Sequence, residues 1–328
     1  MKTSVNRIKG HDYLYAYDSI FVAEKKSIRK TKLLGRVDNL AEATTRKAEF
    51  LRDLKEQEIQ ERTKFWQAKL KHPKFSKYLS VQKMEQVRTN LYRSKKEVGM
   101  FGSDLMEQNF SVDFIFNSNK MEGSKVPLHK VREQVEKPSA KVSEEVRNTL
   151  NALHYVDSQA FKFNRKSIIE LHKLLLGHEP RKIGSFRKEV VVAHNSPVAD
   201  WKDINVKLKE LLEWYHGNRK AMYPPELAFD FYYHFERIHP FIDGNGRTGR
   251  LIMNRILKDH RYHPMIIWNK NHEGHKTAFL KRMEGKAEDF YNFMGSQFIK
   301  THQIYLGKLA SAQTANKQIE SFFRPSDV

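Results

Sequence analysis

The chain has 328 residues, no cysteine, and 59 Lys and Arg against 39 Asp and Glu, which gives a formal net charge of +20. The absence of cysteine excludes a disulfide-stapled secreted scaffold. No apolar run approaches the roughly 20 residues that a membrane-spanning helix needs. Because 39% of the residues are hydrophobic, including 21 Phe and 13 Tyr, the chain can fill a sizeable core, and global disorder is excluded as well.

The N-terminal sequence and the charge set two further expectations. The first residues lack the apolar centre of roughly 7 to 15 residues that a signal peptide requires, so we expect a cytoplasmic protein with no membrane partner. Clustered Lys and Arg neutralise phosphates, which is typical of nucleic-acid binding. The same charge suits an enzyme that handles a nucleoside triphosphate, so both classes of ligand stay open at this point.

The N-terminal third carries half of the excess charge, with 24 basic and 14 acidic residues in positions 1–110. Aromatic and β-branched runs at Tyr13–Tyr17, Ser19–Ala23 and Ile28–Leu34 predict a small antiparallel hairpin or meander. Residues Asn39–Lys71 contain no Gly or Pro and are rich in helix-forming residues. They predict a long, mostly solvated helix, and a second helical stretch follows it.

From about Phe101 the chain becomes less charged and more aromatic. We therefore predict a basic α+β region over residues 1–100, a mainly helical domain over 101–305, and a polar, fraying tail over 306–328. The pattern predicts helices over these stretches: Ser143–Gln159, Ser167–Leu176, Asp203–Tyr215, Pro225–Ile238, Gly246–Asp259 and His275–Met283. In this part a strand is predicted only at Lys188–His194, which has Val190, Val191 and Val192 at its centre.

One twelve-residue stretch, His239 to Arg250 with the sequence HPFIDGNGRTGR, combines the groups that phosphate chemistry needs. The preceding helix must end at His239, because the residue before a proline is disfavoured in a helix. Gly244 and Gly246 flank Asn245 and allow positive φ and close approach of the backbone to a ligand. The loop then enters a helix, whose N-terminal N–H groups make an anion site.

The polar side chains of this stretch have complementary chemical uses. Arg247 and Arg250 lie three residues apart, so they share a helix face and can bind phosphate oxygens together. Asp243 offers the hard oxygen that Mg²⁺ prefers. His239 can accept a proton from an attacking hydroxyl. The stretch therefore predicts a phosphate cradle, a metal ligand and a general base, which suffice for group transfer onto an alcohol.

His-Pro or Asp-Gly-Asn-Gly alone is usually just a turn. The full pattern specifies the residue at eight of twelve positions, and a chance match is negligible because each of these residues has a background frequency of only a few per cent. The stretch resembles the signature of the Fic family, and the resemblance extends over about residues 100–300, including Gly184-Ser185-Phe186-Arg187 before the three valines. It implies a mainly α fold, with a Fic-type helical core and a small β-hairpin flap. It also implies a protein adenylyltransferase, which transfers AMP from Mg-ATP to a Ser, Thr or Tyr hydroxyl of a target protein.

The resemblance assigns a role to each matching residue. His239 would be the base, Asp243 the metal ligand, and Phe241 the residue that anchors the loop in the core. The phosphate contacts would be made as follows: the α-phosphate by Asn245 and the backbone of Gly244 and Gly246, the β-phosphate by Arg247, and the γ-phosphate by Arg250.

A second match lies upstream at Ser118-Asn119-Lys120-Met121-Glu122-Gly123, which resembles the family's inhibitory motif. Ser118 and Glu122 are one helical turn apart, and Gly123 is suited to end the helix. A Glu122 carboxylate bound to Arg250 would occupy the partner of the γ-phosphate, so we expect an autoinhibited enzyme. The alternative is an ordinary solvated helix end.

Other features leave alternatives open. Val190, Val191 and Val192 form either a buried strand or an exposed flap edge that pairs with a target segment. His275 is the nearest candidate where the family often has a tyrosine beside the nucleotide base, so the nucleotide preference stays open. Four histidines have spacings unlike a zinc site: His260, His263, His272 and His275.

The function itself keeps two alternatives. One is removal of AMP from a modified protein by the same site, with Glu122 orienting water. The other is a DNA-binding regulator that carries a Fic core and binds nucleic acid through its basic N-terminal region. Self-modification and a homodimer are further possibilities that the sequence leaves open.

Overall fold

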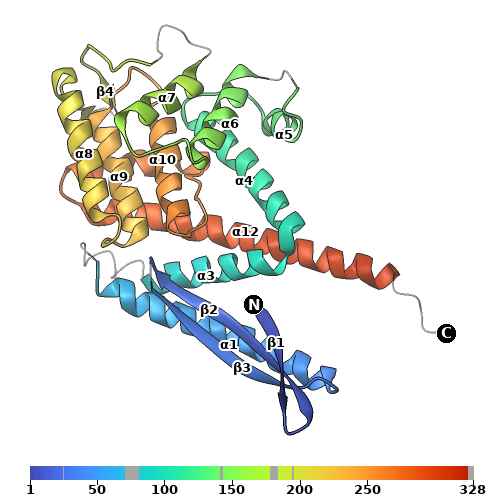
Figure 1. The fold of residues 1–328 in the computed structure, drawn as a ribbon. Helices are drawn as coiled ribbons and strands as arrows, with labels where there is room; N and C mark the ends of the chain where they lie inside the picture. The colour runs from blue at the N-terminus through green and yellow to red at the C-terminus, as the bar shows by residue number, and fades with distance from the viewer. Residues whose placement is uncertain (25, 71–80, 141–142, 178–183, 194–195, 324–328) are drawn as a thin grey trace.

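A computed structural model describes residues 1–328 except 25, 71–80, 141–142, 178–183, 194–195 and 324–328. The described chain is mainly helical, as predicted, with two small sheets (Figure 1). Its N-terminal elements are β1 (Lys2–Ile8), β2 (His11–Ala23), β3 (Lys26–Arg36), α1 (Leu40–Gln67) and α3 (Val81–Glu97). The elements that follow are α4 (Gly99–Met121), α5 (Leu128–Glu136), α6 (Glu144–Asp157), α7 (Arg165–Leu176), β4 (Val192–Ala193), β5 (Ser196–Pro197), α8 (Ile204–Asn218), α9 (Pro224–Ile238), α10 (Asn245–Asp259), α11 (His272–Met283) and α12 (Ala287–Phe323), with short 3₁₀ turns at Trp201–Asp203 and Asn269–Asn271.

The N-terminal sheet is the predicted antiparallel meander, in the order β1-β2-β3. Sequence analysis missed β1, because it is an edge strand whose residues are nearly all exposed and show little apolar alternation. One face of the sheet packs on α1, where Ala16 and Ile20 of β2 meet Phe50 and Leu54. The predicted long helix is therefore held in place by a small core of its own.

Helices α1 and α3 are joined by buried ion pairs. Glu58 of α1 accepts from Arg88 of α3 at 2.6 Å, and Glu85 of α3 accepts from Arg62 of α1 at 2.5 Å. The Tyr262 hydroxyl, from the loop after α10, donates to the same Glu85 carboxylate at 2.5 Å. This buried network connects the N-terminal helices to the later part of the chain. The division into three parts at residues 100 and 305 stays a prediction.

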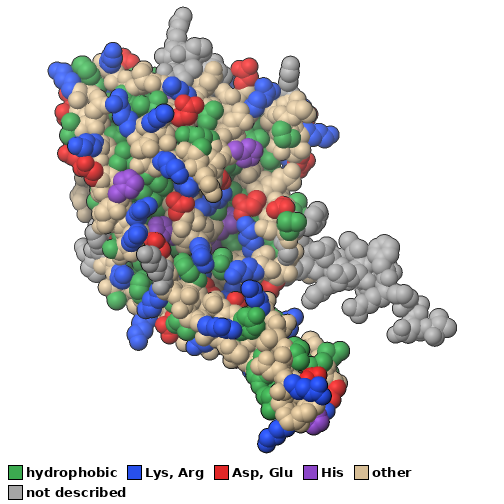
Figure 2. All heavy atoms as spheres, in the orientation of Figure 1, with side chains coloured by type: hydrophobic (Ala, Val, Ile, Leu, Met, Phe, Trp, Pro, Cys, Tyr) green, Lys and Arg blue, Asp and Glu red, His purple; other side chains and the backbone are tan. Residues whose placement is uncertain are grey.

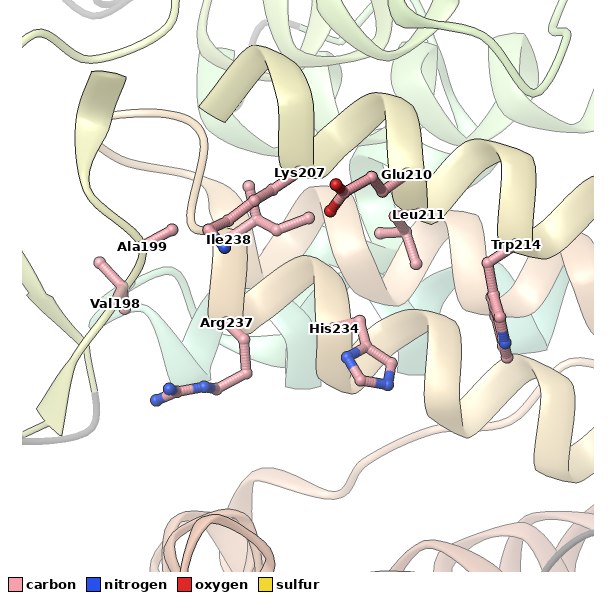
Figure 3. A pocket seen from close by; sticks show the side chains of 9 residues that line it. All are labelled: Val198, Ala199, Lys207, Glu210, Leu211, Trp214, His234, Arg237 and Ile238. Atoms are coloured by element: carbon pink, nitrogen blue, oxygen red, sulfur yellow. The ribbon is translucent and has the colours of Figure 1, made fainter. Parts of the chain in front are cut away.

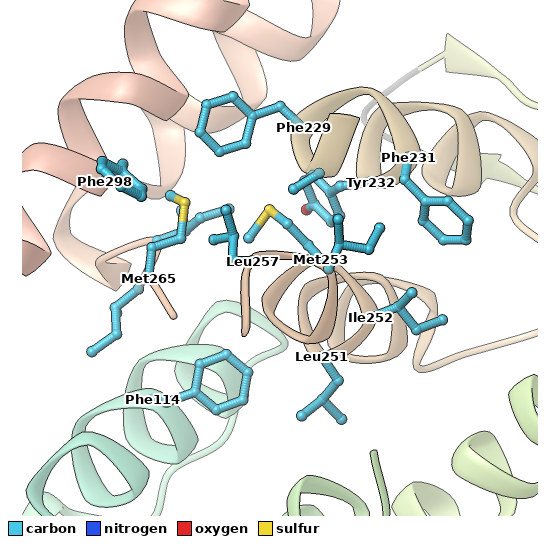
Figure 4. Packing of buried hydrophobic residues seen from close by; sticks show 14 of the residues in the cluster. Phe114, Phe229, Phe231, Tyr232, Leu251, Ile252, Met253, Leu257, Met265 and Phe298 are labelled. Atoms are coloured by element: carbon cyan, nitrogen blue, oxygen red, sulfur yellow. The ribbon is translucent and has the colours of Figure 1, made fainter. Parts of the chain in front are cut away.

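The helices that flank the signature stretch form the centre of the main core. Leu227, Phe231, Phe235 and Ile238 lie on one face of α9, as predicted, and all are buried. Helix α10 packs beside α9 and buries its own aliphatic residues, while Phe114 of α4 and Phe298 of α12 approach the same cluster (Figure 4). The two ends of the signature loop are therefore fixed by rigid, well-packed helices.

The C-terminal expectation was wrong in one respect. Residues Ser311–Phe323 continue α12 as a helix rather than forming a frayed tail, and this helix runs past the core in Figure 1. Residues 324–328 lie outside the described residues. Its first turns bury Phe290 and Met294, and the later Ala, Gln and Lys residues have high helix propensity. Sequence analysis also missed α5. Among the described residues, no helix is long and apolar enough to cross a membrane, and the cytoplasmic location stays a prediction.

Candidate active site

The signature stretch begins where α9 ends. His239 caps the helix in the left-handed conformation, with φ 48° and ψ 61°, and its N–H donates to the Phe235 carbonyl at 2.9 Å. A left-handed backbone at a residue other than glycine costs free energy and persists only where the surroundings enforce it. Here the following proline and the buried loop fix it. The histidine side chain is thereby aimed out of the helix, with 17% of its surface exposed.

The loop is braced by Asn245 from within. Its Oδ1 accepts from the Phe241 N–H at 2.9 Å, and its Nδ2 donates to the Phe241 carbonyl at 2.8 Å. Phe241 is fully buried and stacks on the His172 ring, with centroids 3.7 Å apart. The Asn245 carboxamide thus bonds to backbone at both ends, a structural role that the resemblance did not assign to it.

His172 of α7 packs against the signature loop, a role that the sequence did not predict. Its Nε2 lies 3.0 Å from the Asp243 carbonyl, and burial lowers the pKa of the imidazole to about 4. The ring is therefore neutral at neutral pH, and the Nε2 proton is donated to that carbonyl. Gly244, at φ 74°, lies so close to α7 that a Cβ there would stand 3.1 Å from a Leu176 methyl carbon. Only glycine suits this position without displacement of α7.

The two signature arginines lie on the first turns of α10 and are both buried. Arg247 lies between two carboxylates, at 3.6 Å from Glu145 and 3.7 Å from Asp243. Arg250 is directed toward the end of α4, where its Nε donates to the Ser118 hydroxyl and its Nη2 to the Ser118 carbonyl, each at 3.0 Å. The structure therefore brings together two motifs that are more than 100 residues apart in sequence.

Glu122 completes this contact. Its Oε1 accepts from Arg250 Nη2 at 2.7 Å, and Gly123 ends the helix with φ 92°. Burial alone would lower the pKa of Arg250, but the adjacent Glu122 carboxylate raises it instead. A Cβ added to Gly246 would stand 2.5 Å from the same Oε1. The Glu122 carboxylate therefore lies directly over the N-terminus of α10, where an anion would bind.

A cavity of about 230 Å³ opens between His239, Asp243 and Glu122. Behind His239, the Glu236 carboxylate lies 3.9 Å from its Nδ1. His275, at the start of α11, lies 3.2 Å from the Tyr232 hydroxyl through its Nε2. The cavity thus combines three histidines, three carboxylates and an arginine in one place, with the Tyr232 ring in its wall. The other residues that line it are Met121, Val192, Ala193, Tyr232, Glu236, Ile242, Gly244, Asn245, Gly246, Arg250, His272 and His275.

The valine segment is exposed rather than buried. Val190 and Val192 have 81% and 66% of their surface exposed, so the interpretation as a buried strand is wrong. Among the described residues the strand is also shorter than predicted, since only Val192–Ala193 pairs with Ser196–Pro197. His194, the predicted end of the strand, lies outside the described residues. The resulting β4–β5 hairpin borders the cavity through Val192 and Ala193.

Arg187 ties this hairpin segment to the signature loop, a role that sequence analysis missed. The guanidinium is buried and donates to the carbonyls of His239 at 2.7 Å, Glu189 at 2.7 Å and Ala199 at 2.6 Å. The Arg187 N–H also donates to the Pro240 carbonyl at 3.0 Å. A positive charge at the carbonyl end of α9 is favourable, and it fixes the hairpin beside the histidine. The motif Gly-Ser-Phe-Arg before the valines was the signal that could have found it.

A second cavity, of about 470 Å³, lies on the far side of α9. It forms between α8 and α9 beside the residues that follow β5, with Trp214 and Lys207 on α8 facing His234 and Arg237 on α9 (Figure 3). None of the signature residues lines it, so we do not assign it to the nucleotide. Among the described residues, no group of three or more His, Cys, Asp or Glu could hold a metal by itself.

Comparison with known proteins matches the signature stretch to one family. Residues 162–257 match the model of the Fic/DOC family. A protein adenylyltransferase Fic from Drosophila willistoni is 32% identical over 204 residues, which cover 58% of this chain and 41% of that protein. The Drosophila ananassae protein of the same name is 34% identical over 161 residues, or 47% of this chain and 32% of that protein. The chain thus spans about two fifths of the length of these relatives or less.

Solved structures show the same fold. A Fic domain-containing signalling protein from Bacteroides thetaiotaomicron superposes with a TM-score of 0.59 at 21% identity, over 69% of this chain and 98% of that one. Fic-1 from C. elegans superposes with a TM-score of 0.59 at 20% identity, over 70% of this chain and 73% of that one. At this identity the similarity concerns the arrangement of the helices alone.

Proposed function

Because the chain carries a Fic/DOC family domain, we propose that it is a protein adenylyltransferase, which transfers AMP from ATP to a Ser, Thr or Tyr hydroxyl of a target protein. The observation that carries the proposal is the pairing of Arg250 with Glu122 over Gly246. A buried arginine, held beside a helix N-terminus that a glycine leaves open, is a site built for a phosphate. The carboxylate that now lies there occupies the place of that anion.

Each group of cavity residues has a separate role in the proposed transfer of AMP. The backbone N–H groups at the start of α10 hold the α-phosphate, and the Asn245 side chain braces the loop that presents them. Arg247 and Arg250 bind the β- and γ-phosphates, which fixes the direction of the leaving group. His239 takes the proton of the target hydroxyl as its oxygen bonds to the α-phosphorus. The bond from that phosphorus to the bridging oxygen breaks, and pyrophosphate leaves. Catalysis rests on positioning and on charge stabilisation.

We place Mg²⁺ at Asp243 in this proposal. The Asp243 side chain borders the cavity and is 33% exposed. Mg²⁺ typically binds one or two protein carboxylates together with substrate phosphates and water, so a single carboxylate beside a phosphate cradle fits the ion. When bound, it would neutralise charge on the phosphates. His172 and the Gly244 N–H hold the backbone and side chain of Asp243 in place, through bonds of 3.0 and 2.6 Å.

Regulation follows from the same contact. Since Glu122 engages Arg250, ATP can bind with its γ-phosphate in the productive place only after the carboxylate leaves. We propose that Ser118, Glu122 and Gly123 form an inhibitory helix end and that the resting enzyme is largely autoinhibited. Ser118 would then hold the Arg250 side chain in place while the Glu122 side chain moves away.

The target segment would extend along the hairpin. Exposed backbone and side chains at Val190, Val191 and Val192 can pair with an extended peptide, a common mode of peptide recognition. The hairpin borders the same cavity as His239, so a hydroxyl on the paired segment would reach the histidine. The identity of the target, self-modification and a homodimer stay predictions.

Mass spectrometry of the Glu122→Gly protein after incubation with ATP and Mg²⁺ tests the proposal. We expect AMP attached to the protein itself or to an added target, and no adduct when His239 is also replaced by alanine. If AMP is instead released from a pre-modified target by the unmutated protein, the reverse reaction is the function. If neither occurs while the folded protein binds nucleic acid, the chain is a regulator with an inactive core.

A further inference from the structure

The outer face of the N-terminal sheet carries a row of aromatic side chains. Even-numbered residues of β2, such as Ala16 and Ile20, are buried against α1. Because successive side chains of a strand point to opposite faces, the odd-numbered residues lie on the face that α1 does not cover. Four of them are aromatic: Tyr13, Tyr15, Tyr17 and Phe21.

The neighbouring strands widen this face with polar and basic residues. The register places Lys2, Ser4 and Asn6 of β1 opposite the three tyrosines, and Arg29 of β3 lies opposite Ser19. The Arg29 guanidinium stands 4.7 Å from the centre of the Tyr17 ring. At the end of the row, Arg261 from the loop after α10 stands 3.9 Å from the Phe21 ring. On this face, cations therefore lie beside Tyr17 and Phe21, at one end of the aromatic row.

The acidic residues of these strands are on the opposite side. Both carboxylates of β2, Asp12 and Asp18, have even numbers and share the α1 face. Asp18 lies 3.3 Å from Arg93 and 3.6 Å from the N-terminal amino group. The outer face thus has exposed Lys2 and Arg29 without a carboxylate from the described strands. Figure 2 shows Lys and Arg side chains beside hydrophobic side chains, and some Asp or Glu side chains, over this lower part of the molecule.

This combination fits one kind of ligand. Single-stranded nucleic acid is bound by aromatic rings on which unpaired bases stack, together with cations that neutralise its backbone. Alternate residues on a strand are about 6.8 Å apart, so the three tyrosines form a ladder along β2. A duplex would present its paired bases edge-on and gain no stacking. An acidic protein would use the cations but would have no need for the row of rings.

We propose that the outer face of the β1–β3 sheet binds single-stranded nucleic acid, with bases stacked on Tyr13, Tyr15 and Tyr17 and phosphates neutralised by Lys2 and Arg29. Residues 1–110 carry a net charge of +10, which attracts such a polyanion over a longer range. None of these residues lines the cavity at His239. The proposal therefore stands whether or not the protein transfers AMP.

Fluorescence anisotropy on the full chain tests this, with labelled dT and U oligonucleotides of about 12 nucleotides and a duplex of the same length. We expect both single strands to bind more tightly than the duplex, and the dT and U affinities tell DNA from RNA. Tyr15→Ala and Tyr17→Ala each weaken binding, by roughly 5-fold to 150-fold, which is the loss of one stacked base. Tyr17→Phe keeps the ring and retains most of the affinity, and circular dichroism checks that each variant is folded.

The basic residue has a matched control. Arg29→Gln lowers the dependence of log affinity on log salt by about 0.7, the value for one phosphate contact of a single strand. Lys209→Gln, at an exposed lysine of α8 that lies 3.7 Å from Glu213, leaves that slope unchanged. Equal affinity for duplex and single strand, or unaltered binding by folded Tyr15→Ala and Tyr17→Ala proteins, would overturn the proposal. So would capture of a poly-glutamate peptide without binding of either oligonucleotide, which would assign the face to an acidic protein.

Discussion

Replacement of Glu122 by glycine tests the proposed inhibitory contact directly. The Glu122 carboxylate accepts a 2.7 Å bond from Arg250, which is 3% exposed, while the glutamate side chain is 26% exposed. A hydrogen bond between charged groups contributes about 1.5 to 3 kcal/mol, and we take the lower half of that range because the glutamate is partly solvated. A loss of about 1.5 to 2 kcal/mol from the state in which Glu122 binds Arg250 changes the population ratio of this blocked state to the open state by roughly 10- to 30-fold.

We therefore expect Glu122→Gly to raise incorporation of labelled AMP from ATP by about 10- to 30-fold over the parent protein. Glu136→Gly is a matched control, because Glu136 also ends a helix but pairs with the exposed Arg132 at 3.4 Å. It should leave incorporation unchanged. Circular dichroism and thermal unfolding confirm that both variants fold. A folded Glu122→Gly protein that incorporates no more AMP than its parent would refute the reasoning.

Three further predictions concern the base, the hairpin and the buried histidine. In the Glu122→Gly background, His239→Ala should lower the rate of AMP transfer at least about 100-fold. The ATP affinity, measured by calorimetry, should stay within a few-fold of that of the Glu122→Gly protein. A smaller drop in the transfer rate would mean that another group takes the proton. Arg187→Met leaves the carbonyls of His239, Glu189 and Ala199 without the hydrogen bonds of the guanidinium. This substitution should lower the free energy of unfolding by about 3 kcal/mol. Arg237→Met, at a more exposed arginine that donates to Pro197, should cost less than about 1 kcal/mol, and equal losses in denaturant titrations would contradict the account. Burial lowers the pKa of His172 to about 4, so between about pH 4 and pH 6.5 the unfolded chain binds a proton at this residue while the folded chain does not. The free energy of unfolding should therefore rise by about 3 kcal/mol from pH 4 to pH 6.5 because of this residue. His172→Phe should reduce the measured rise in the free energy of unfolding by that amount.

The sequence predicted the loop well because its constraints are local. Positive φ at Gly244, the helix end at His239 and the helix that starts directly after Gly244 all follow from the residue types at those positions. The role of Asn245 did not follow, because whether a carboxamide bonds to a ligand or to nearby backbone depends on how the loop closes.

Other misses have a similar origin in long-range contacts. Arg187 and His172 act on carbonyls that are 52 and 71 residues away in sequence, so no spacing reveals them. Strand β1 shows little apolar alternation because it lies at an edge, and the end of α12 carries too few apolar residues to mark a helix by periodicity. The helices with one clear apolar face, such as α9, were predicted nearly to their ends.

The buried network around Glu85 sets a limit on how this chain can recombine. The hydroxyls of Tyr223 and Tyr262, which lie in the later, helical part of the chain, both donate to that single carboxylate, at 3.1 and 2.5 Å. A descendant that lost its first hundred residues would lose the acceptor of both hydroxyls and would expose to solvent the apolar surface that α1 and α3 now cover. We therefore expect the N-terminal segment to be inherited together with the helical part that follows it, and Tyr223 and Tyr262 to change only in concert with Glu85.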